Sequence, residues 1–217
     1  MNIEQARFNM IEQQIRPWNV LDPQILQLLS DVKRETFVSA AHQSLAFVDM
    51  ELPLVDGQCM LFPKVEARLL QDLNVQKHER VLEIGAGSGY MAALLAHRAV
   101  QVITLEIKPA LVELAKSNLR LAGIGNVEVR LGDGAKDVSA LGSFDVIVLS
   151  GSVASVPQAL LALLKPGGRL AAIVGDEPIM QAHFVKRESG DKFVTTRPWD
   201  MCAPRLLSFP ETSAFSF

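Results

Sequence analysis

The fold of this chain is decided by one stretch, Val81-Leu82-Glu83-Ile84-Gly85-Ala86-Gly87-Ser88-Gly89-Tyr90. Apolar and β-branched residues run into three glycines, and an apolar pattern with helical spacing follows over residues 91–96. This order predicts a strand, a tight turn and a helix. Glycines allow positive φ angles and a close approach of a ligand to the main chain, and the first turn of a helix offers unpaired N–H groups. The stretch therefore predicts a site for a nucleotide-like ligand.

The spacing of these glycines favours one class of cofactor. A dinucleotide fingerprint is G-x-G-x-x-G/A and requires Gly or Ala where this chain has Tyr90. The pattern here is G-x-G-x-G, which is similar to motif I of the class I S-adenosylmethionine-dependent methyltransferases. In those enzymes the loop encloses the amino-acid end and the ribose of a cofactor that has no pyrophosphate. Taken alone, the triplet leaves open a Gly-rich turn in an unrelated α/β domain.

Length and composition exclude several classes of protein. The 217 residues suit one domain with an appendage, and a net charge of −3 argues against a general nucleic-acid binder. The apolar runs are too short to cross a bilayer and the N-terminus lacks a signal-peptide h-region, so we expect a soluble cytoplasmic protein. Two cysteines, Cys59 and Cys202, are too few for a disulfide framework or a zinc site. We therefore expect reduced thiols and no structural metal.

The N-terminal third is predicted to be mainly helical. Apolar residues recur at helical spacing over residues 3–15, and Arg16-Pro17 ends that pattern. Asp22-Pro23 begins a second helix that continues to Val32. We interpret both as lid helices. The next segment, residues 33–57, shows no sustained period and is predicted to be irregular with short strands, before a third helix from Pro63 to Leu73.

Strands and helices alternate through the middle of the chain. Buried-strand compositions occupy residues 100–106, 127–131, 144–149 and 169–174, and helical patterns occupy 110–122 and 156–164. Such alternation predicts a parallel sheet with right-handed crossovers and helices on both faces. The fold class is α/β, a class I methyltransferase Rossmann-like fold with a doubly wound, mostly parallel sheet.

The end of the chain changes character. Residues 184–188 and 192–196 are predicted strands around a Ser-Gly-Asp turn, which indicates an antiparallel hairpin at the edge of the sheet. We expect a single methyltransferase domain with three parts. Residues 1–75 form the helical lid and substrate region, 76–175 the cofactor-binding core, and 176–217 the C-terminal antiparallel strands.

Polar residues stand at the carboxyl ends of the predicted strands, where ligands of open α/β sheets bind. Glu106 lies about twenty residues beyond Gly85, the offset at which an acid accepts hydrogen bonds from ribose hydroxyls; the alternative is a solvated strand-end glutamate. Asp133 is placed to accept the adenine amino group, or else forms an Asp-Gly turn. We also expect the turn over residues 165–168 to converge on the same ligand.

Glu83 is an acid inside a strand that otherwise has a buried composition. A buried carboxylate requires hydrogen-bond donors. The cofactor's ammonium group or the N–H groups of the glycine loop would supply them, and a salt bridge to Lys or Arg is the alternative. Together these strand-end residues favour a methyltransferase over an NAD-dependent dehydrogenase, which Tyr90 disfavours.

Over most of its length the sequence resembles the protein-L-isoaspartate O-methyltransferase family. The matching stretches are residues 32–38 (Val-Lys-Arg-Glu-Thr-Phe-Val), 52–54 with Gly57-Gln58, 81–90, 132–134, 144–148 and 164–170. The resemblance implies a cytosolic enzyme that uses S-adenosyl-L-methionine, with S-adenosyl-L-homocysteine as product, to methylate the α-carboxyl of isoaspartyl residues in damaged proteins. The cofactor-binding residues that we predict are Glu83, Gly85, Ala86, Gly87, Ser88, Gly89, Glu106, Ile107, Asp133, Gly134 and Ser150.

The departures from the family pattern fall on the substrate side. After Gly-Gln the family motif is Thr-Ile-Ser-Gln/Ala-Pro, with a serine hydroxyl near the substrate carboxylate, whereas this chain has Cys59-Met60-Leu61-Phe62-Pro63. Leu61 takes the place of the serine, and a hydrogen bond to a charged group contributes about 1.5 to 3 kcal/mol. The family's Val-Pro-Leu signature near the C-terminus is replaced by residues 203–207, and its Ala-Ala after Val148 by residues 150–152. Residues 59–62 are the candidate substrate pocket.

The chemistry expected of the family limits the search for catalytic residues. Methyl transfer is an in-line displacement, so the protein contributes alignment and exclusion of water, and a carboxylate acceptor is already ionised at pH 7. We therefore assign no catalytic residue. A less acidic nucleophile would require a base, for which His42, Asp49 and Asp56 are unranked candidates, each of which is otherwise a surface residue.

Three hypotheses about function remain open at this stage. The first is a methyltransferase acting on a protein or peptide carboxylate or on a small, less polar acceptor, since Cys59 to Phe62 suggest an apolar pocket. The second is an S-adenosylmethionine-binding protein without catalysis, and the third is the dehydrogenase. We expect neither nucleic acid nor membrane as a partner, and the oligomeric state is left open.

Overall fold

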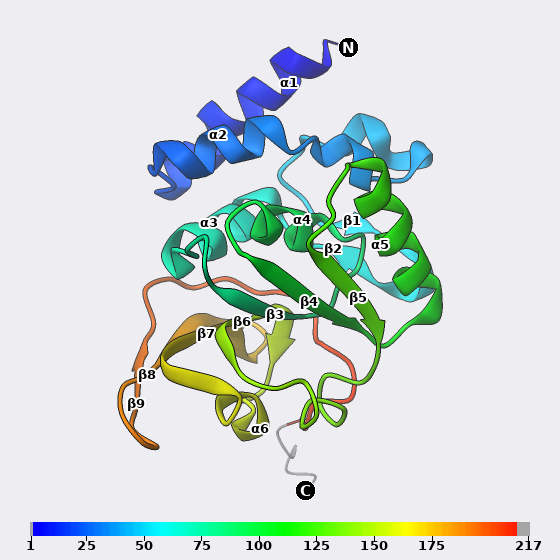
Figure 1. Cartoon of the computed structure of the whole chain (residues 1–217). Coiled ribbons are helices and arrows are strands. Elements are labelled where there is room, and N and C mark those ends of the chain that lie inside the picture. The colour runs from blue at the N-terminus through cyan, green and yellow to red at the C-terminus, as the bar shows by residue number, and fades with distance from the viewer. Residues whose placement is uncertain (1, 212–217) are drawn as a thin grey trace, which may run out of the picture.

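The central element of the protein is a seven-stranded sheet with the strand order β5-β4-β3-β6-β7-β8-β9 (Figure 1). The computed structural model describes residues 2–211. Neighbouring strands from β5 to β7 run parallel, whereas β7, β8 and β9 pair antiparallel. This confirms the predicted doubly wound, mostly parallel sheet with a C-terminal hairpin. The strands are β3 Arg80–Ile84, β4 Gln101–Glu106, β5 Val127–Leu131, β6 Phe144–Val153, β7 Leu164–Asp176, β8 Ile179–Arg187 and β9 Phe193–Thr196.

Helices cover the two faces of the sheet unevenly. On one face lie α3 Pro63–Leu73, α4 Tyr90–Ala96 and α5 Pro109–Leu121, while the four-residue helix α6 Gln158–Leu161 packs on the other (Figure 1). Successive strand residues alternate between these faces, because side chains of a strand point alternately up and down. Val81 therefore joins the apolar cluster below α3 and α4, whereas Leu82 joins the cluster beneath α6.

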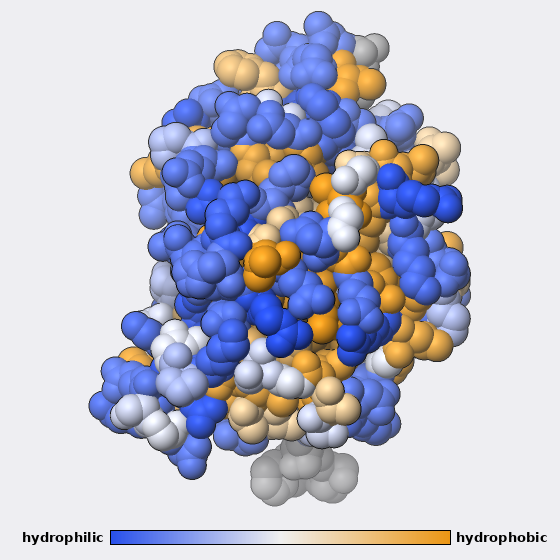
Figure 2. Space-filling view, viewed as in Figure 1, coloured by the Kyte–Doolittle hydropathy of each residue, from blue (hydrophilic) through white to orange (hydrophobic). Residues whose placement is uncertain are grey.

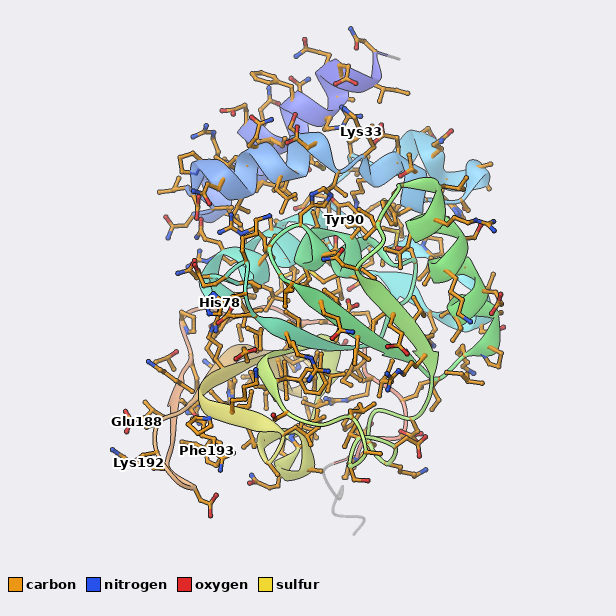
Figure 3. All side chains as sticks on the ribbon, viewed as in Figure 1. Lys33, His78, Tyr90, Glu188, Lys192 and Phe193 are labelled. Carbon is orange, nitrogen blue, oxygen red and sulfur yellow. The ribbon has the colours of Figure 1, made fainter. Side chains whose placement is uncertain are left out.

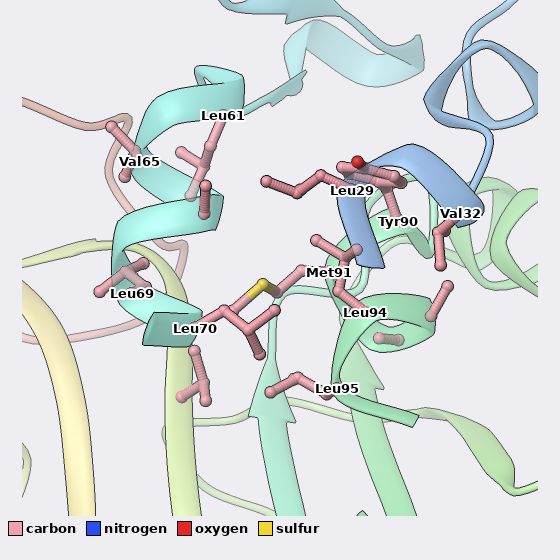
Figure 4. Close-up of a cluster of buried hydrophobic side chains, with 14 of the residues drawn as sticks. Leu29, Val32, Leu61, Val65, Leu69, Leu70, Tyr90, Met91, Leu94 and Leu95 are labelled. Atoms are coloured by element: carbon pink, nitrogen blue, oxygen red, sulfur yellow. The ribbon is translucent and has the colours of Figure 1, made fainter. Parts of the chain in front are cut away.

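The N-terminal helices form a second layer above α3 and α4 (Figure 1). The first, α1 Ile3–Met10, continues into a π-helical turn (η1, Ile11–Ile15) and a 3₁₀ turn (η2, Arg16–Trp18), so the predicted end at Arg16-Pro17 is confirmed. The second, α2 Pro23–Asp31, is capped by the Asp22 carboxylate, which accepts a hydrogen bond from the Gln24 N–H at 2.8 Å. Its apolar face packs onto the core, as Figure 4 shows for Leu29.

The segment before α3 is mostly built of 3₁₀ turns. These are η3 Arg34–Phe37, η4 Ala40–Leu45 and η5 Val55–Gly57, and the short strands β1 Leu52–Pro53 and β2 Cys59–Met60 form a separate antiparallel pair. The prediction of an irregular segment with short strands is confirmed. The pair β1–β2 brings Cys59 and Met60 to the start of α3.

Two predicted boundaries were wrong near β6. The strand was predicted to end at Leu149 but continues through residues 150–152, because the Ser152 N–H donates to the Pro204 carbonyl (2.7 Å) and the Leu206 N–H donates to the Ser152 carbonyl (2.9 Å). A segment from the far end of the chain thus supplies the missing strand partner. The helix predicted over residues 156–164 is reduced to α6.

The turn over residues 165–168 does not converge on the other strand ends. Phe144 at the start of β6 pairs with Leu164, and Lys165 forms an ion pair of 2.7 Å with Asp145. The Asp145 carboxylate also accepts a hydrogen bond from the N–H of Arg80, the first residue of β3. The turn therefore lies at the amino edge of the sheet, opposite the edge where β3, β4 and β5 end. The reason is that residues 165–168 lie at the beginning of β7, in the irregular stretch between its pairing with Phe144 and with Val146, whereas the predicted site lies at the ends of the strands.

The pairing of β7 with β8 was not predicted. The sequence pattern indicated only the hairpin around Ser189-Gly190-Asp191, whose labelled residues Glu188, Lys192 and Phe193 lie together in Figure 3. In the structure β8 begins at Ile179, well before the predicted strand, and pairs along its length with β7. The first half of β8 contains Gln181, Ala182 and His183, and alanine is depleted in strands, so its composition gives little indication of a strand.

Polar side chains cover most of the surface seen in Figure 2, with apolar side chains in small groups between them. Within residues 2–211, no helix has the length and apolar character needed to cross a membrane.

Candidate active site

A pocket lies at the carboxyl edge of the sheet. It forms where the strand order reverses, between β3 and β6, which is the place where open α/β sheets bind ligands. Four strands contribute residues to it, and a C-terminal segment closes one side. The lining residues are Gln58, Cys59, Ile84, Gly85, Gly87, Leu105, Glu106, Ile107, Leu111, Gly132, Gly134, Ser150, Leu206, Leu207 and Phe209. We name this the cofactor-edge pocket.

The glycine loop is shaped by its contacts with neighbouring elements. Gly85 has a φ of 93° and its N–H donates to the Leu105 carbonyl at 2.9 Å, which ties the start of the loop to β4. Gly89 has a φ of 86°, and a Cβ there would lie 3.3 Å from the Ala115 Cα of α5. Both positions favour glycine, because L-residues rarely adopt positive φ. The predicted strand, turn and helix are thus confirmed, and α4 begins at Tyr90.

Glu106 is the best-ordered acid of the cofactor-edge pocket. One carboxylate oxygen accepts from the Gly87 N–H at 2.9 Å and the other from the Lys108 N–H at 3.0 Å, and the residue is buried. Each carboxylate oxygen has a further lone pair free for a ligand hydroxyl. Glu106 is therefore no solvated strand-end residue; it is fixed in the pocket wall, with Ile107 beside it.

Asp133 is turned away from this pocket. Its Oδ1 accepts from the Ala135 N–H at 2.9 Å, and its Oδ2 forms an ion pair of 3.1 Å with Lys136. Desolvation acts to raise the pKa of the Asp133 carboxyl, but these partners and Ser208 together outweigh it and hold the pKa below its usual value. Of the Gly132-Asp133-Gly134 stretch, only the two glycines line the pocket. These contacts fit the alternative interpretation of an Asp-Gly turn, and the adenine contact stays a prediction.

Glu83 is fully buried in β3, and Ser150 of β6 satisfies one of its oxygens. The Ser150 hydroxyl donates to Oε1 at 2.7 Å. Oε2 is buried and makes no hydrogen bond of good geometry within residues 2–211, although the Thr104 hydroxyl lies close enough to act on the carboxyl. Burial raises the pKa of Glu83 to about 8, against the opposing effects of Ser150 and Thr104. Within the described part of the chain no Lys or Arg forms an ion pair with Glu83, so this buried acid has capacity for a cationic donor.

A second, smaller pocket adjoins the first and shares Cys59, Gly85, Gly87 and Ser150 with it. We name it the acceptor pocket. Three of the four predicted substrate residues line it, whereas Phe62 is not among its lining residues and caps α3 instead. Figure 4 shows Leu61 at the start of α3, across the cluster from Tyr90 and Met91. The lining residues are Cys59, Met60, Leu61, Glu66, Glu83, Gly85, Ala86, Gly87, Ser88, Tyr90, Met91 and Ser150.

One buried arginine connects the walls of the acceptor pocket. Arg34 donates from Nη2 to the Leu61 carbonyl at 2.9 Å and from Nη1 to the Glu66 carboxylate. Its guanidinium lies 4.8 Å from the ring centroid of Tyr90, the residue that follows the glycine loop. Figure 3 shows Tyr90 between the sheet and the segment that carries Lys33. Arg34 therefore holds three parts of the wall in place relative to one another: Leu61, α3, and the helix α4 that follows the glycine loop.

The three candidate bases lie outside both pockets. The His42 ring contacts the Ser39 hydroxyl at 3.1 Å, Asp49 pairs with Lys64 at 2.7 Å, and Asp56 is exposed in a turn. Cys59 does line the pockets, but burial, with Glu51 nearby, raises the pKa of its thiol to about 11. The thiol is thus protonated at neutral pH. Within residues 2–211, no group of His, Cys, Asp and Glu side chains is arranged to hold a metal ion.

Two parts of the site were not predicted. Glu66 stands at a position of α3 whose spacing partners, Leu69, Leu70 and Leu73, are all buried, so an acid on the apolar face of the predicted helix was a visible signal. The C-terminal residues Leu206 to Phe209 carried no such signal. Their place over Gly85 depends on the backbone pairing with Ser152.

Comparison with known proteins identifies the family. The family model of the protein-L-isoaspartate(D-aspartate) O-methyltransferases matches residues 5–201. The chain belongs to this family. Among its relatives, the protein-L-isoaspartate O-methyltransferase of Methanoculleus marisnigri is 37% identical over 183 residues, covering 84% of this chain and 83% of the relative. Protein-L-isoaspartate O-methyltransferase 1 of Rhodopseudomonas palustris is 41% identical over 175 residues, covering 81% and 71%.

Solved structures agree on the fold. A Plasmodium falciparum protein assigned as a protein-L-isoaspartate O-methyltransferase, in complex with S-adenosyl-L-homocysteine, matches with a TM-score of 0.79 at 19% identity, covering 94% of this chain and 97% of that one. Membership of this family of S-adenosylmethionine-dependent methyltransferases rejects the dehydrogenase hypothesis.

Proposed function

We propose that this member of the protein-L-isoaspartate O-methyltransferase family transfers a methyl group from S-adenosylmethionine to the α-carboxyl of isoaspartyl residues in protein or peptide. The observation that supports this most is the continuity of the two pockets through Cys59, Gly85, Gly87 and Ser150. A cofactor bound across this boundary would be held by residues at the strand ends. It would supply its methyl group beside residues 59–61.

The residues of the cofactor-edge pocket fit such a cofactor. The Glu106 carboxylate would accept hydrogen bonds from ribose hydroxyls, and the buried Glu83, with Oε2 left over, would accept from the α-ammonium group. The glycine loop, Ala86, Ser88, Ile107, Gly134 and Ser150 would surround the rest, and we retain Asp133 only as a backbone neighbour. Bound S-adenosylmethionine supplies an electrophilic methyl group on a sulfonium.

The protein's own part in the reaction is alignment. A carboxylate acceptor is ionised at neutral pH and requires no base, in agreement with a pocket whose thiol and phenol both have raised pKa values. The apolar side chains of Met60, Leu61 and Met91 exclude water from the acceptor pocket. We infer that the chain has three parts. Residues 1–75 contact the acceptor, residues 76–175 hold the cofactor, and residues 176–217 form the edge of the sheet.

The test is transfer of a labelled methyl group from S-adenosylmethionine to a synthetic isoaspartyl peptide, with the aspartyl peptide of the same sequence as control. Transfer to the isoaspartyl peptide alone supports the proposal. Binding of S-adenosyl-L-homocysteine in calorimetry without transfer to either peptide would instead favour a cofactor-binding protein without catalysis or a different acceptor.

A further inference from the structure

The wall of the acceptor pocket carries an unexpected acid, Glu66 of α3. Its side chain is 5% exposed and lies among the lining residues together with Glu83. The other lining side chains are apolar or are those of Ala, Ser, Cys and Tyr, and the described residues that line this pocket include no Lys, Arg or His. An isoaspartyl carboxylate that enters the pocket thus meets acids and no cationic side chain.

Arg34 lies behind Glu66 and not in the pocket. Its side chain is fully buried, it is absent from the lining residues, and its Nη1 donates to Glu66 Oε2. The ion pair is neutral as a whole, but it turns its negative end towards the acceptor. If Glu66 takes up a proton, the positive charge of Arg34 is no longer balanced, and the new O–H becomes a donor in the pocket wall.

We propose that Glu66 determines the specificity of the acceptor pocket, disfavouring an anionic acceptor when it is ionised and admitting one when it is protonated. This inference rests on the proposed function. It assigns to the protonated Glu66 the hydrogen bond that a serine supplies in the family motif and that Leu61 does not make here. Glu83 is the neighbour assigned to the cofactor's ammonium, so Glu66 is the acid left to face the acceptor.

The switch falls in the neutral pH range. Burial raises the pKa of Glu66 to about 7, with Arg34 acting in the opposite direction. The charged or titratable groups that face it are Arg34 from η3, Glu83 from β3, Tyr90 from α4 and Cys59 from β2. Tyr90 and Cys59 stay neutral at this pH, because burial raises both of their pKa values. An ionised Glu66 and the carboxylate of the acceptor repel each other strongly in a pocket that excludes water.

The experiment compares the native protein with Glu66→Gln, which keeps the shape of the side chain and removes its charge. With the isoaspartyl peptide and S-adenosylmethionine, we expect native kcat/KM to fall roughly tenfold from pH 6 to pH 8.5, since a hydrogen bond to a charged group corresponds to a ten- to hundredfold effect. In both proteins the ammonium group of the bound cofactor would keep Glu83 ionised over this range, so the variant should show no such fall and should exceed the native protein about tenfold at pH 8.5.

Peptide binding gives a readout independent of turnover. Calorimetry of the isoaspartyl peptide with the S-adenosyl-L-homocysteine complex should show the same pH dependence of Kd in the native protein. The corresponding peptide with an α-carboxamide is neutral, so its Kd should not change with pH. An equal pH dependence for both peptides would overturn the proposal.

Glu35→Gln is the matched control, because it changes the other buried Arg–Glu pair. Glu35 accepts from Arg7, is similarly buried, and lines neither pocket. It should keep the native pH dependence. The inference is overturned if kcat/KM of Glu66→Gln falls with rising pH as it does in the native protein. It is also overturned if kcat/KM of Glu35→Gln does not fall. If Glu66→Gln does not fold, the double variant Arg34→Met, Glu66→Met replaces the pair by apolar residues. Its kcat/KM should not fall with rising pH, and it should not exceed that of the native protein at pH 8.5.

The outcomes separate this inference from the proposed function. If the native protein methylates the peptide and Glu66→Gln has the same pH profile, the function stands and the role of Glu66 is rejected. If only Glu66→Gln methylates it, the role of Glu66 stands and the native acceptor is another molecule. If neither protein binds or methylates the isoaspartyl peptide at any pH, both proposals fail.

Discussion

The two pockets at the carboxyl edge of the sheet differ in how their walls are built. The cofactor-edge pocket is formed by short loops that directly follow β3, β4 and β5, and its key acid, Glu106, is held by backbone N–H groups at 2.9 and 3.0 Å. The acceptor pocket is assembled from segments far apart in the chain, held together by the side chain of Arg34. Backbone geometry fixes the first pocket, whereas side-chain identity fixes the second.

This difference explains where the chain departs from its family. Residues that hold a common cofactor through the main chain tolerate little change, because a glycine with positive φ has few substitutes. A wall made of side chains changes its chemistry with single substitutions. Here Leu61 takes the place of the serine of the family motif, and Glu66 adds an acid to the same wall. The predictions below test this contrast, beginning with the largest expected effect.

The largest effect is expected for Glu106→Ala. The substitution removes the acceptor for the Gly87 and Lys108 N–H groups and the proposed ribose contacts. With at least two hydrogen bonds to a charged group lost, each of about 1.5 to 3 kcal/mol, the Kd for S-adenosyl-L-homocysteine should rise roughly a hundredfold or more in calorimetry.

The control for this variant is Glu128→Ala in β5. Glu128 is half-exposed, pairs with Arg130 and lies outside the cofactor-edge pocket, so its loss should leave the Kd unchanged. If Glu106→Ala bound the cofactor product within threefold of the native protein, the cofactor-edge assignment would be wrong.

Leu61→Ser tests the acceptor side. It returns a hydroxyl to a buried position of the pocket wall, and a hydroxyl that donates to the acceptor carboxylate should raise kcat/KM for the isoaspartyl peptide about tenfold. Leu61→Ala is the matched control, because it removes the same side chain without adding a donor. Equal gains in the two variants would show that space, and not the hydroxyl, limits the acceptor.

The pH dependence of stability should reveal the buried acids directly. Unfolded glutamates titrate near pH 4.5, while burial raises the pKa of Glu66 to about 7 and that of Glu83 to about 8. Between these values the native state holds more protons than the unfolded state, so the free energy of unfolding falls as pH rises from about 5 to 8. We expect a loss on the order of 6 kcal/mol in urea titrations of the cofactor-free protein.

Glu83→Gln should flatten this profile in the same pH range. Carboxyls with lowered pKa values, such as Asp145 and Glu79, act in a different window, since their stabilisation is lost only as the pH falls below about 4.5. A stability that rises between pH 5 and 8 would contradict the burial of the two acids in their protonated form.

The smallest effect is expected for Asp133→Asn. The side-chain oxygen that accepts from the Ala135 N–H is retained, and the residue does not line the cofactor-edge pocket. The Kd for S-adenosyl-L-homocysteine should therefore change by less than about threefold, the equivalent of about 0.6 kcal/mol. A tenfold loss would restore the adenine contact predicted from the sequence.

Much of the fold follows from local patterns. The glycine stretch, the acid closing β4, the cap Asp22 and the helix-starting Pro63 act on residues close to them in sequence. The predicted elements around them are confirmed within one or two residues. The errors fall where the partner is distant. The extension of β6 through Ser150 depends on pairing with Pro204 and Leu206, which no local pattern reveals.

The sequence by itself determined the sheet, its glycine loop and the position of Glu106, because these depend on backbone preferences and on short loops. Only the tertiary structure decided the acceptor pocket. It turned the carboxylate of Asp133 into its own loop, moved the turn at residues 165–168 to the opposite edge, and set Glu66 beside Leu61. The charge of a buried acid depends on its neighbours in space, and the Arg34 that lies behind Glu66 comes from a segment 32 residues earlier in the chain.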